Sequence, residues 1–169
     1  MSKIILSEAE IDRALTRISY EILERFEGID NLVLVGIKTR GICLAKQIQN
    51  NIERLEGKVD CLELDVTHYR DDYMGDKTSE TKVSKQLEGK HVVLVDDVLF
   101  TGRTIRASLD AVMDYGRPQS VSLAVLVDRG HRELPIRPDF IGKNIPTSKN
   151  ESVKVLVNEI DGESQVIIK

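Results

Sequence analysis

The chain has 169 residues with 41% apolar side chains and no Trp, so we expect residues 1–169 to form one domain with a core of Val, Ile and Leu. Its net charge of −4 does not indicate a nucleic-acid binder, and no apolar run approaches the length of a membrane span. The start holds too short an apolar run for a signal peptide. Cys43 and Cys61 match no CxxC motif or metal-ligand cluster, so we expect buried thiols in a cytoplasmic protein.

Apolar spacing in the first third of the chain predicts a helix, a strand and a second helix. Ser7 and Glu10 form a capping box at the start of the first helix. The apolar face of this helix repeats at helical spacing, through Ile11, Leu15, Ile18 and Ile22. The wholly apolar run 32–35 predicts a strand covered on both faces, as in parallel sheets, and helical spacing returns between Ile42 and Leu55.

The remaining chain continues the alternation of strands and helices. In order, we expect a strand at 59–65, a long polar loop at 67–90, a strand at 92–95, a helix at 105–112, a strand at 121–127, a largely irregular segment at 129–149, and a final hairpin of 153–160 and 165–168. This order predicts an α/β fold, with a central, mostly parallel sheet flanked by helices. Ligands of such sheets bind at the carboxyl ends of the strands.

The segment 92–104 carries the strongest chemical signal. Its apolar strand delivers Asp96 and Asp97 to the carboxyl end, and a short turn then opens a helix with the sequence Thr-Gly-Arg-Thr. Backbone N–H groups at a helix start bind phosphate because they lack partners inside the helix. Gly102 lets the backbone approach closely, and Thr101 and Thr104 add hydroxyl donors. The segment therefore predicts a phosphate cup beside a carboxylate pair.

A second candidate anion site is the segment 36–41, which also follows a predicted strand and precedes a helix. Two glycines, Gly36 and Gly41, bracket the cations Lys38 and Arg40. This arrangement suits a pyrophosphate, although the segment alone is equally typical of a basic turn. Its position one strand–helix unit before the phosphate cup favours the binding site.

These two segments resemble the 5-phosphoribosyl-1-pyrophosphate (PRPP) motif and pyrophosphate loop of type I phosphoribosyltransferases. The resemblance implies that fold, with a small hood and a flexible lid, and a cis non-proline peptide near Thr39–Arg40. It implies that PRPP brings Mg²⁺, with Asp96 or Asp97 as a possible ligand and no metal site made of protein ligands alone. The implied catalytic residues are Asp96, Asp97 and Arg40. The implied PRPP-binding residues are Thr39, Arg40, Gly41, Asp96, Asp97, Thr101, Gly102, Arg103 and Thr104. The implied lid residues are His68, Tyr69, Arg70, Asp71 and Asp72.

The stretches 126–139 and 141–148, with 13–17, closely resemble the PyrR family of bacterial pyrimidine operon regulators. The resemblance implies a homodimer or homotetramer that converts uracil and PRPP to UMP and diphosphate. It also implies that UMP or UTP promotes binding to the pyr messenger RNA leader, and hence transcription termination. Phe100 supports a pyrimidine, because hypoxanthine-guanine relatives place there an Asp that assists at the purine ring. The expected base-binding residues are Val127, Asp128 and Arg129.

An RNA-binding surface is expected from the same resemblance. The segment 129–149 holds five cations against two acids, although charge alone favours an ordinary solvated rim. We expect one surface, distinct from the PRPP site, made of Thr16, Arg17, His131, Arg132, Arg137 and Lys143. Tyr20 departs from the family, since many members carry a His there. A salvage phosphoribosyltransferase without RNA binding, or a non-catalytic PRPP sensor, stays open, whereas a DNA-binding repressor needs a further domain.

Overall fold

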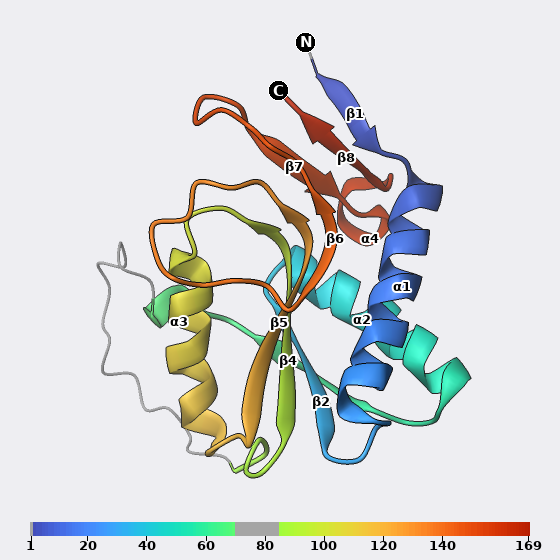
Figure 1. Ribbon diagram of the computed structural model, residues 1–169, viewed down its shortest axis with the longest axis vertical. Helices are drawn as coiled ribbons and strands as arrows, with labels where there is room; N and C mark the ends of the chain where they lie inside the picture. Colours follow the sequence, from blue (N-terminus) through green and yellow to red (C-terminus); the bar gives the residue numbers. More distant parts are fainter. Residues whose placement is uncertain (1, 70–84) are drawn as a thin grey trace.

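The computed structural model describes residues 2–69 and 85–169 and contains two sheets (Figure 1). In chain order the elements are β1 (Lys3–Leu6), α1 (Glu8–Phe26), β2 (Leu32–Ile37), α2 (Arg40–Leu55), β3 (Asp60–Leu64), the 3-10 turn η1 (Thr67–Tyr69), β4 (His91–Leu99), α3 (Arg103–Val112), the 3-10 turn η2 (Met113–Tyr115), β5 (Ser120–Asp128), β6 (Phe140–Asn144), β7 (Val153–Leu156), α4 (Asn158–Asp161) and β8 (Gln165–Ile168).

The larger sheet confirms the expected parallel α/β architecture. Its strand order is β3-β2-β4-β5-β6, and all neighbouring strands are parallel. Helices α1 and α2 cover one face and α3 covers the other (Figure 1). Because both faces are covered, the central strands are continuous apolar runs, and Leu34, Val93 and Leu94 are fully buried.

Helix α1 follows the sequence-based prediction closely. The Ser7 hydroxyl accepts a hydrogen bond from the Glu10 backbone, and the Glu10 carboxylate accepts one from the Ser7 backbone, so the capping box is present. The four predicted apolar residues are all buried. The helix ends at Phe26, where Glu27 takes the left-handed conformation with φ of 54°.

In the larger sheet one predicted boundary is wrong, and one strand was not predicted. Strand β4 does not end before the carboxylate pair but continues through Asp96 and Asp97 to Leu99, because β5 is long enough to keep pairing with it. The segment 129–149 is largely irregular, as predicted, but it also contains the short strand β6. This strand lies at the edge of the sheet and runs from the buried Phe140 to the exposed Lys143 and Asn144, so its sequence has no apolar pattern that would predict it.

A second, antiparallel sheet joins the two ends of the chain. Its order is β1-β8-β7, so the first strand pairs with the last (Figure 1). The sequence did not predict β1, and the predicted strand 153–160 is too long. Strand β7 ends at Leu156 because the Asp161 carboxylate accepts the Val157 N–H at 2.8 Å and organises the short helix α4.

Cys43 and Cys61 are half-buried rather than buried as expected. Burial raises the pKa of the Cys61 thiol to about 11, and burial also raises the pKa of Cys43. Both thiols are therefore protonated at neutral pH, which fits no nucleophilic role. Among the described helices, none is both long enough and apolar enough to cross a membrane.

Candidate active site

The carboxylate pair lies where β4 extends beyond β2. Strand β2 pairs with β4 as far as Val95, and the next two residues of β4 are Asp96 and Asp97. Asp96 is 8% exposed, and its Oδ1 accepts the Asp97 N–H at 2.9 Å. Asp97 is half-buried, and its Oδ1 accepts the Val98 N–H at 2.8 Å. These bonds hold both carboxylates at the carboxyl edge of the sheet.

The predicted pyrophosphate loop lies directly against this pair. A Cβ atom on Gly41 would lie 2.4 Å from the carbonyl oxygen of Val95 and 3.2 Å from the Cα of Asp96. Only glycine therefore lets α2 begin so close to β4. The peptide bond between Lys38 and Thr39 is cis, one bond before the position that the family resemblance indicated.

Two helices begin at this edge without a capping side chain. The N-cap of α2 is Thr39 and that of α3 is Gly102, which has φ of 93°, and neither side chain caps its helix. Thr101 supports the turn before α3, since its hydroxyl accepts the Arg103 N–H at 3.3 Å. Backbone N–H groups and the helix dipole favour an anion at each helix start, so two candidate anion sites flank the carboxylates.

Arg40 makes a contact that the sequence did not predict. Its Nε and Nη2 atoms donate to the two carboxylate oxygens of Asp161, at 3.2 and 2.8 Å. The hydrogen bond with Asp161 is the main reason that the pKa of Arg40 is raised, and the negative charge of Asp97 raises this pKa further. The only sequence signal at Asp161 was its Asp-Gly pair, which we interpreted as a hairpin turn.

The phosphate cup contacts the segment that follows β5. The Glu133 backbone N–H donates to the Thr101 carbonyl at 2.8 Å, and the Glu133 carboxylate accepts from Arg103 Nε at 2.8 Å. Side chains of Leu134 and Ile136 lie within 3.7 Å of where a Cβ on Gly102 would stand. The turn that opens α3 is therefore in direct contact with residues 133–136.

A pocket of about 400 Å³ opens beside the predicted base-binding residues and is lined by Asp128, Arg129, Gly130, His131, Arg132, Asn144, Ile145 and Pro146. Val127 itself is fully buried in β5. The Arg129 guanidinium lies 4.0 Å from the centre of the Phe100 ring and donates to the carbonyls of Ser148 and Glu151, so this side chain supports the pocket wall.

Two of the predicted RNA-binding residues border this same pocket. Arg132 Nη2 donates to Asp128 Oδ2 at 2.5 Å, and a ring nitrogen of His131 lies 2.5 Å from the Thr147 carbonyl. His131 has φ of 67°, so the chain turns sharply here. The predicted RNA-binding residues and the candidate base pocket are therefore adjacent at this point, whereas the RNA surface was expected to be distinct from the PRPP site.

The other RNA candidates lie around α1 and β6. Arg17 donates to the carbonyls of Ile141 and Gly142, at 3.0 and 2.7 Å, so α1 and the segment after residue 127 do meet. Hydrogen bonds with Ser7 lower the pKa of Glu10 most, and the charge of Lys143 adds to this effect. Lys143 therefore lies near the start of α1.

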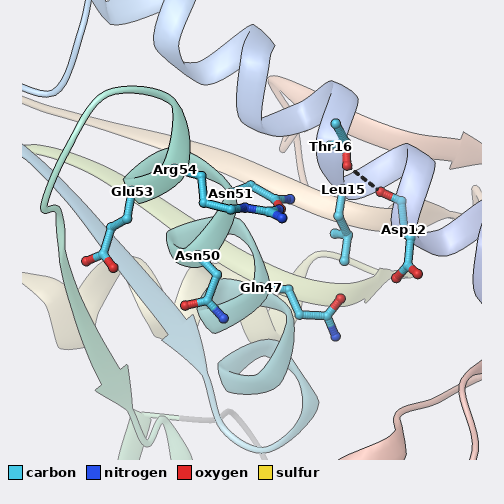
Figure 2. Close-up of a pocket in the computed structure, with 8 residues that line it drawn as sticks. All are labelled: Asp12, Leu15, Thr16, Gln47, Asn50, Asn51, Glu53 and Arg54. Atoms are coloured by element: carbon cyan, nitrogen blue, oxygen red, sulfur yellow. Dashed lines mark hydrogen bonds between the residues drawn. The ribbon is translucent and has the colours of Figure 1, made fainter.

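Thr16 and Arg137 complete the RNA candidates. Thr16 lines an open groove of about 730 Å³ between α1 and α2 (Figure 2). It faces polar side chains of α2 there, and its hydroxyl donates to the Asp12 carbonyl at 2.8 Å. Arg137 is exposed in the segment between β5 and β6, as is Tyr20 on α1.

The start of the predicted lid lies at η1. Tyr69 packs against the apolar cluster around α3, and its carbonyl accepts Arg106 Nη2 at 3.2 Å. His68 belongs to the same turn. The further lid residues Arg70, Asp71 and Asp72 lie outside the described residues. Within the described ranges, no cluster of three or more His, Cys, Asp or Glu residues suits a metal ion.

Comparison with known proteins shows the class of protein to which this chain belongs. The family model of the phosphoribosyl transferase domain matches residues 1–159. Solved structures with the same fold include the hypoxanthine phosphoribosyltransferase of Staphylococcus aureus, at 21% identity and a TM-score of 0.72 over 98% of this chain and 90% of that one. The enzyme of Trypanosoma cruzi in complex with the product IMP gives 20% identity and a TM-score of 0.73 over 98% and 89%.

Relatives of similar sequence show the particular group within this class of proteins. The bifunctional protein PyrR of Limosilactobacillus reuteri is 58% identical over 100% of this chain and 99% of that protein. The PyrR protein of Clostridioides difficile is 56% identical over 98% and 96%. The chain therefore belongs to the phosphoribosyltransferase family and, within it, to the PyrR proteins.

Proposed function

We propose that this protein is a uracil phosphoribosyltransferase, which converts uracil and PRPP to UMP and diphosphate, and a pyrimidine operon regulator. One observation carries the enzymatic part. Two helices without capping side chains begin on either side of the Asp96–Asp97 pair, at the carboxyl edge of a parallel sheet. That arrangement suits a ligand with two separate phosphate groups joined by a hydroxylated sugar.

Each end of PRPP has a matching element. The start of α3, Thr101 to Thr104, holds the 5′-phosphate through N–H and hydroxyl donors. Asp96 and Asp97 accept hydrogen bonds from the ribose hydroxyls, and their charge favours the positive charge that develops on the sugar. The loop 38–41 holds the pyrophosphate, and the charge of Asp97 acts on Arg40 in this loop.

Magnesium fits this site as an ion that arrives with PRPP. Mg²⁺ is usually held by one or two carboxylates together with substrate phosphates and water. The half-buried Asp97 offers such a carboxylate, and Asp96 is the alternative. When bound, the ion neutralises charge on the leaving pyrophosphate.

The uracil base belongs in the pocket beside Asp128. The pocket opens next to the Phe100 ring, which has no group that assists a purine. Asp128, the last residue of β5, and Arg129 line this pocket, whereas Val127 is fully buried in β5. The Arg129 N–H and the Asp128 carbonyl are already paired with Leu99 and Ile145. The remaining polar groups of the pocket therefore read the base.

The regulatory partner is the pyr leader RNA. Arg17, Arg132, Arg137 and Lys143 supply the charge that neutralises RNA phosphates, and Thr16 and His131 contact a splayed loop base. Residues 1–169 work as one domain, and the protein assembles as a homodimer or homotetramer. The names of the relatives, which call those proteins bifunctional, support both roles.

A direct assay tests the enzymatic role. Uracil, PRPP and Mg²⁺ are expected to yield UMP and diphosphate, with hypoxanthine and guanine inactive as controls. A protein that binds PRPP but forms no UMP is only a PRPP sensor. Activity with uracil but no affinity for leader RNA would leave the salvage enzyme, and the exposed Tyr20 would then be the first residue to exchange for His.

A further inference from the structure

We infer that Asp161 is a positioning residue for PRPP, which fixes the Arg40 guanidinium over the pyrophosphate site from the small sheet. The inference rests on the proposed function and adds a residue to it. Asp161 lies on α4, between β7 and β8, and Arg40 is the first residue of α2. The pair therefore joins two parts of the fold that are remote in sequence.

The geometry of the pair leaves the arginine able to bind a ligand. Arg40 uses one N–H on Nε and one on Nη2 for the two oxygens of Asp161. A guanidinium has five N–H donors in one plane, so three others point away from the carboxylate. A bidentate partner on one side fixes the plane of the Arg40 guanidinium, so the N–H groups on its opposite side point in one fixed direction.

Asp161 is itself held in place. Its Oδ2 also accepts the Val157 N–H at 2.8 Å, and the side chain is only 17% exposed, against 34% for Arg40. Hydrogen bonds from Arg40 and Val157 lower the pKa of the Asp161 carboxyl, so it is ionised at neutral pH. A fixed, ionised partner is what a positioning role requires.

The place at which Arg40 is held is the pyrophosphate site. Arg40 follows the cis peptide at Lys38–Thr39 and precedes Gly41, which touches the backbone of Asp96. The charge of Asp97 acts on it as well. Without Asp161 the long, flexible side chain of Arg40 would become ordered only when pyrophosphate binds, and the entropy lost in that ordering would weaken the affinity for pyrophosphate.

The test measures binding of magnesium pyrophosphate by calorimetry, followed by steady-state kinetics. In Asp161→Asn we expect pyrophosphate affinity to fall about tenfold and the KM for PRPP to rise by a similar factor, while the KM for uracil stays unchanged. Glu159→Gln removes an exposed carboxylate from the same helix and is the matched control, with wild-type values. In an Arg40→Ala background, Asp161→Asn is expected to have no further effect.

The outcomes separate the inference from the proposed function. Unchanged pyrophosphate affinity in Asp161→Asn, or equal effects on PRPP and uracil, would overturn the positioning role. Additive losses in the Arg40→Ala background would overturn it as well. If Asp161→Asn does not fold, Asp161→Glu carries the test, because a displaced carboxylate shifts Arg40 and must still weaken pyrophosphate binding. A wild-type protein that binds pyrophosphate but makes no UMP would refute the enzymatic proposal alone.

Discussion

Asp96 and Asp97 are neighbours in sequence and yet have different surroundings. Asp96 is nearly buried, whereas Asp97 is half-buried beside the pyrophosphate loop and within electrostatic range of Arg40. The hydroxyls of Thr101 and Thr104 lie at the start of α3, on the other side of the pair. We therefore propose that these residues contribute to different steps, the threonines to binding and Asp97 to the reaction at the sugar.

Substitutions at these residues are expected to separate KM from kcat. Thr101→Val combined with Thr104→Val removes contacts made equally in the ground state and the transition state, so it mainly raises the KM for PRPP. Asp97→Asn removes a charge that favours the sugar cation, so it lowers kcat more. Steady-state kinetics with varied PRPP measures both effects. Wild-type kinetics in both variants would mean that the active site lies elsewhere.

Most candidate residues could be predicted because their chemistry is local. Asp96 and Asp97 follow an apolar run, and Thr101 precedes a helix start, so this short local pattern is enough to predict a phosphate cup beside a carboxylate pair. Asp161 could not be predicted, because its partner Arg40 lies 121 positions away and only the packing of the small sheet brings them together. Likewise the link between Glu133 and Arg103 depends on a tertiary contact and not on a motif.

At the scale of elements, the close approach of α2 to β4 decides whether a PRPP site exists. Gly41→Ala would place a methyl group 2.4 Å from the Val95 carbonyl, which must push α2 away from the carboxylates. We expect a loss of about 1–3 kcal/mol in the free energy of unfolding and a larger loss of PRPP affinity. Denaturant unfolding and a PRPP titration measure the two effects. Wild-type PRPP affinity in this variant would contradict the contact.

The segment between β5 and β6 contains two arginines that are expected to act differently. Arg132 pairs with Asp128 at the base pocket, whereas Arg137 is exposed further along the segment. Arg137→Ala is therefore expected to weaken RNA binding, to flatten its salt dependence by about 0.7–0.9 units of slope, and to leave uracil transfer nearly intact. Arg132→Ala is expected to impair both activities. Equal loss of both activities in Arg137→Ala would mean that the two surfaces are one.

The elements themselves were predictable where their apolar pattern is complete. Strands β2, β4 and β5 are covered on both faces and therefore appear as unbroken apolar runs. Strand β6 has a neighbouring strand on one side only and contains Gly142, Lys143 and Asn144. Its sequence therefore has no apolar pattern from which a strand could be predicted. Strand β1 is short, and its partner β8 lies at the other end of the chain.

At the scale of the whole molecule, the segment after β5 forms a wall that borders both the candidate nucleotide site and the proposed RNA-binding residues. On one side it contacts the phosphate cup through Glu133, and it lines the base pocket with His131 and Arg132. On the other side it continues into β6, where Arg17 binds the edge carbonyls. A nucleotide that fills the cup and the pocket must contact this wall, which gives it a route to influence RNA binding.

We propose that one chain binds uracil nucleotides and leader RNA at adjoining, coupled sites. The most direct measurement is the affinity for a pyr leader stem-loop, determined by fluorescence anisotropy at low salt with and without saturating UMP. We expect UMP to tighten RNA binding at least about fivefold, and RNA to tighten UMP binding by the same factor. RNA affinity that is absent at low salt in the presence of UMP, or that is identical with and without it, would contradict the claim.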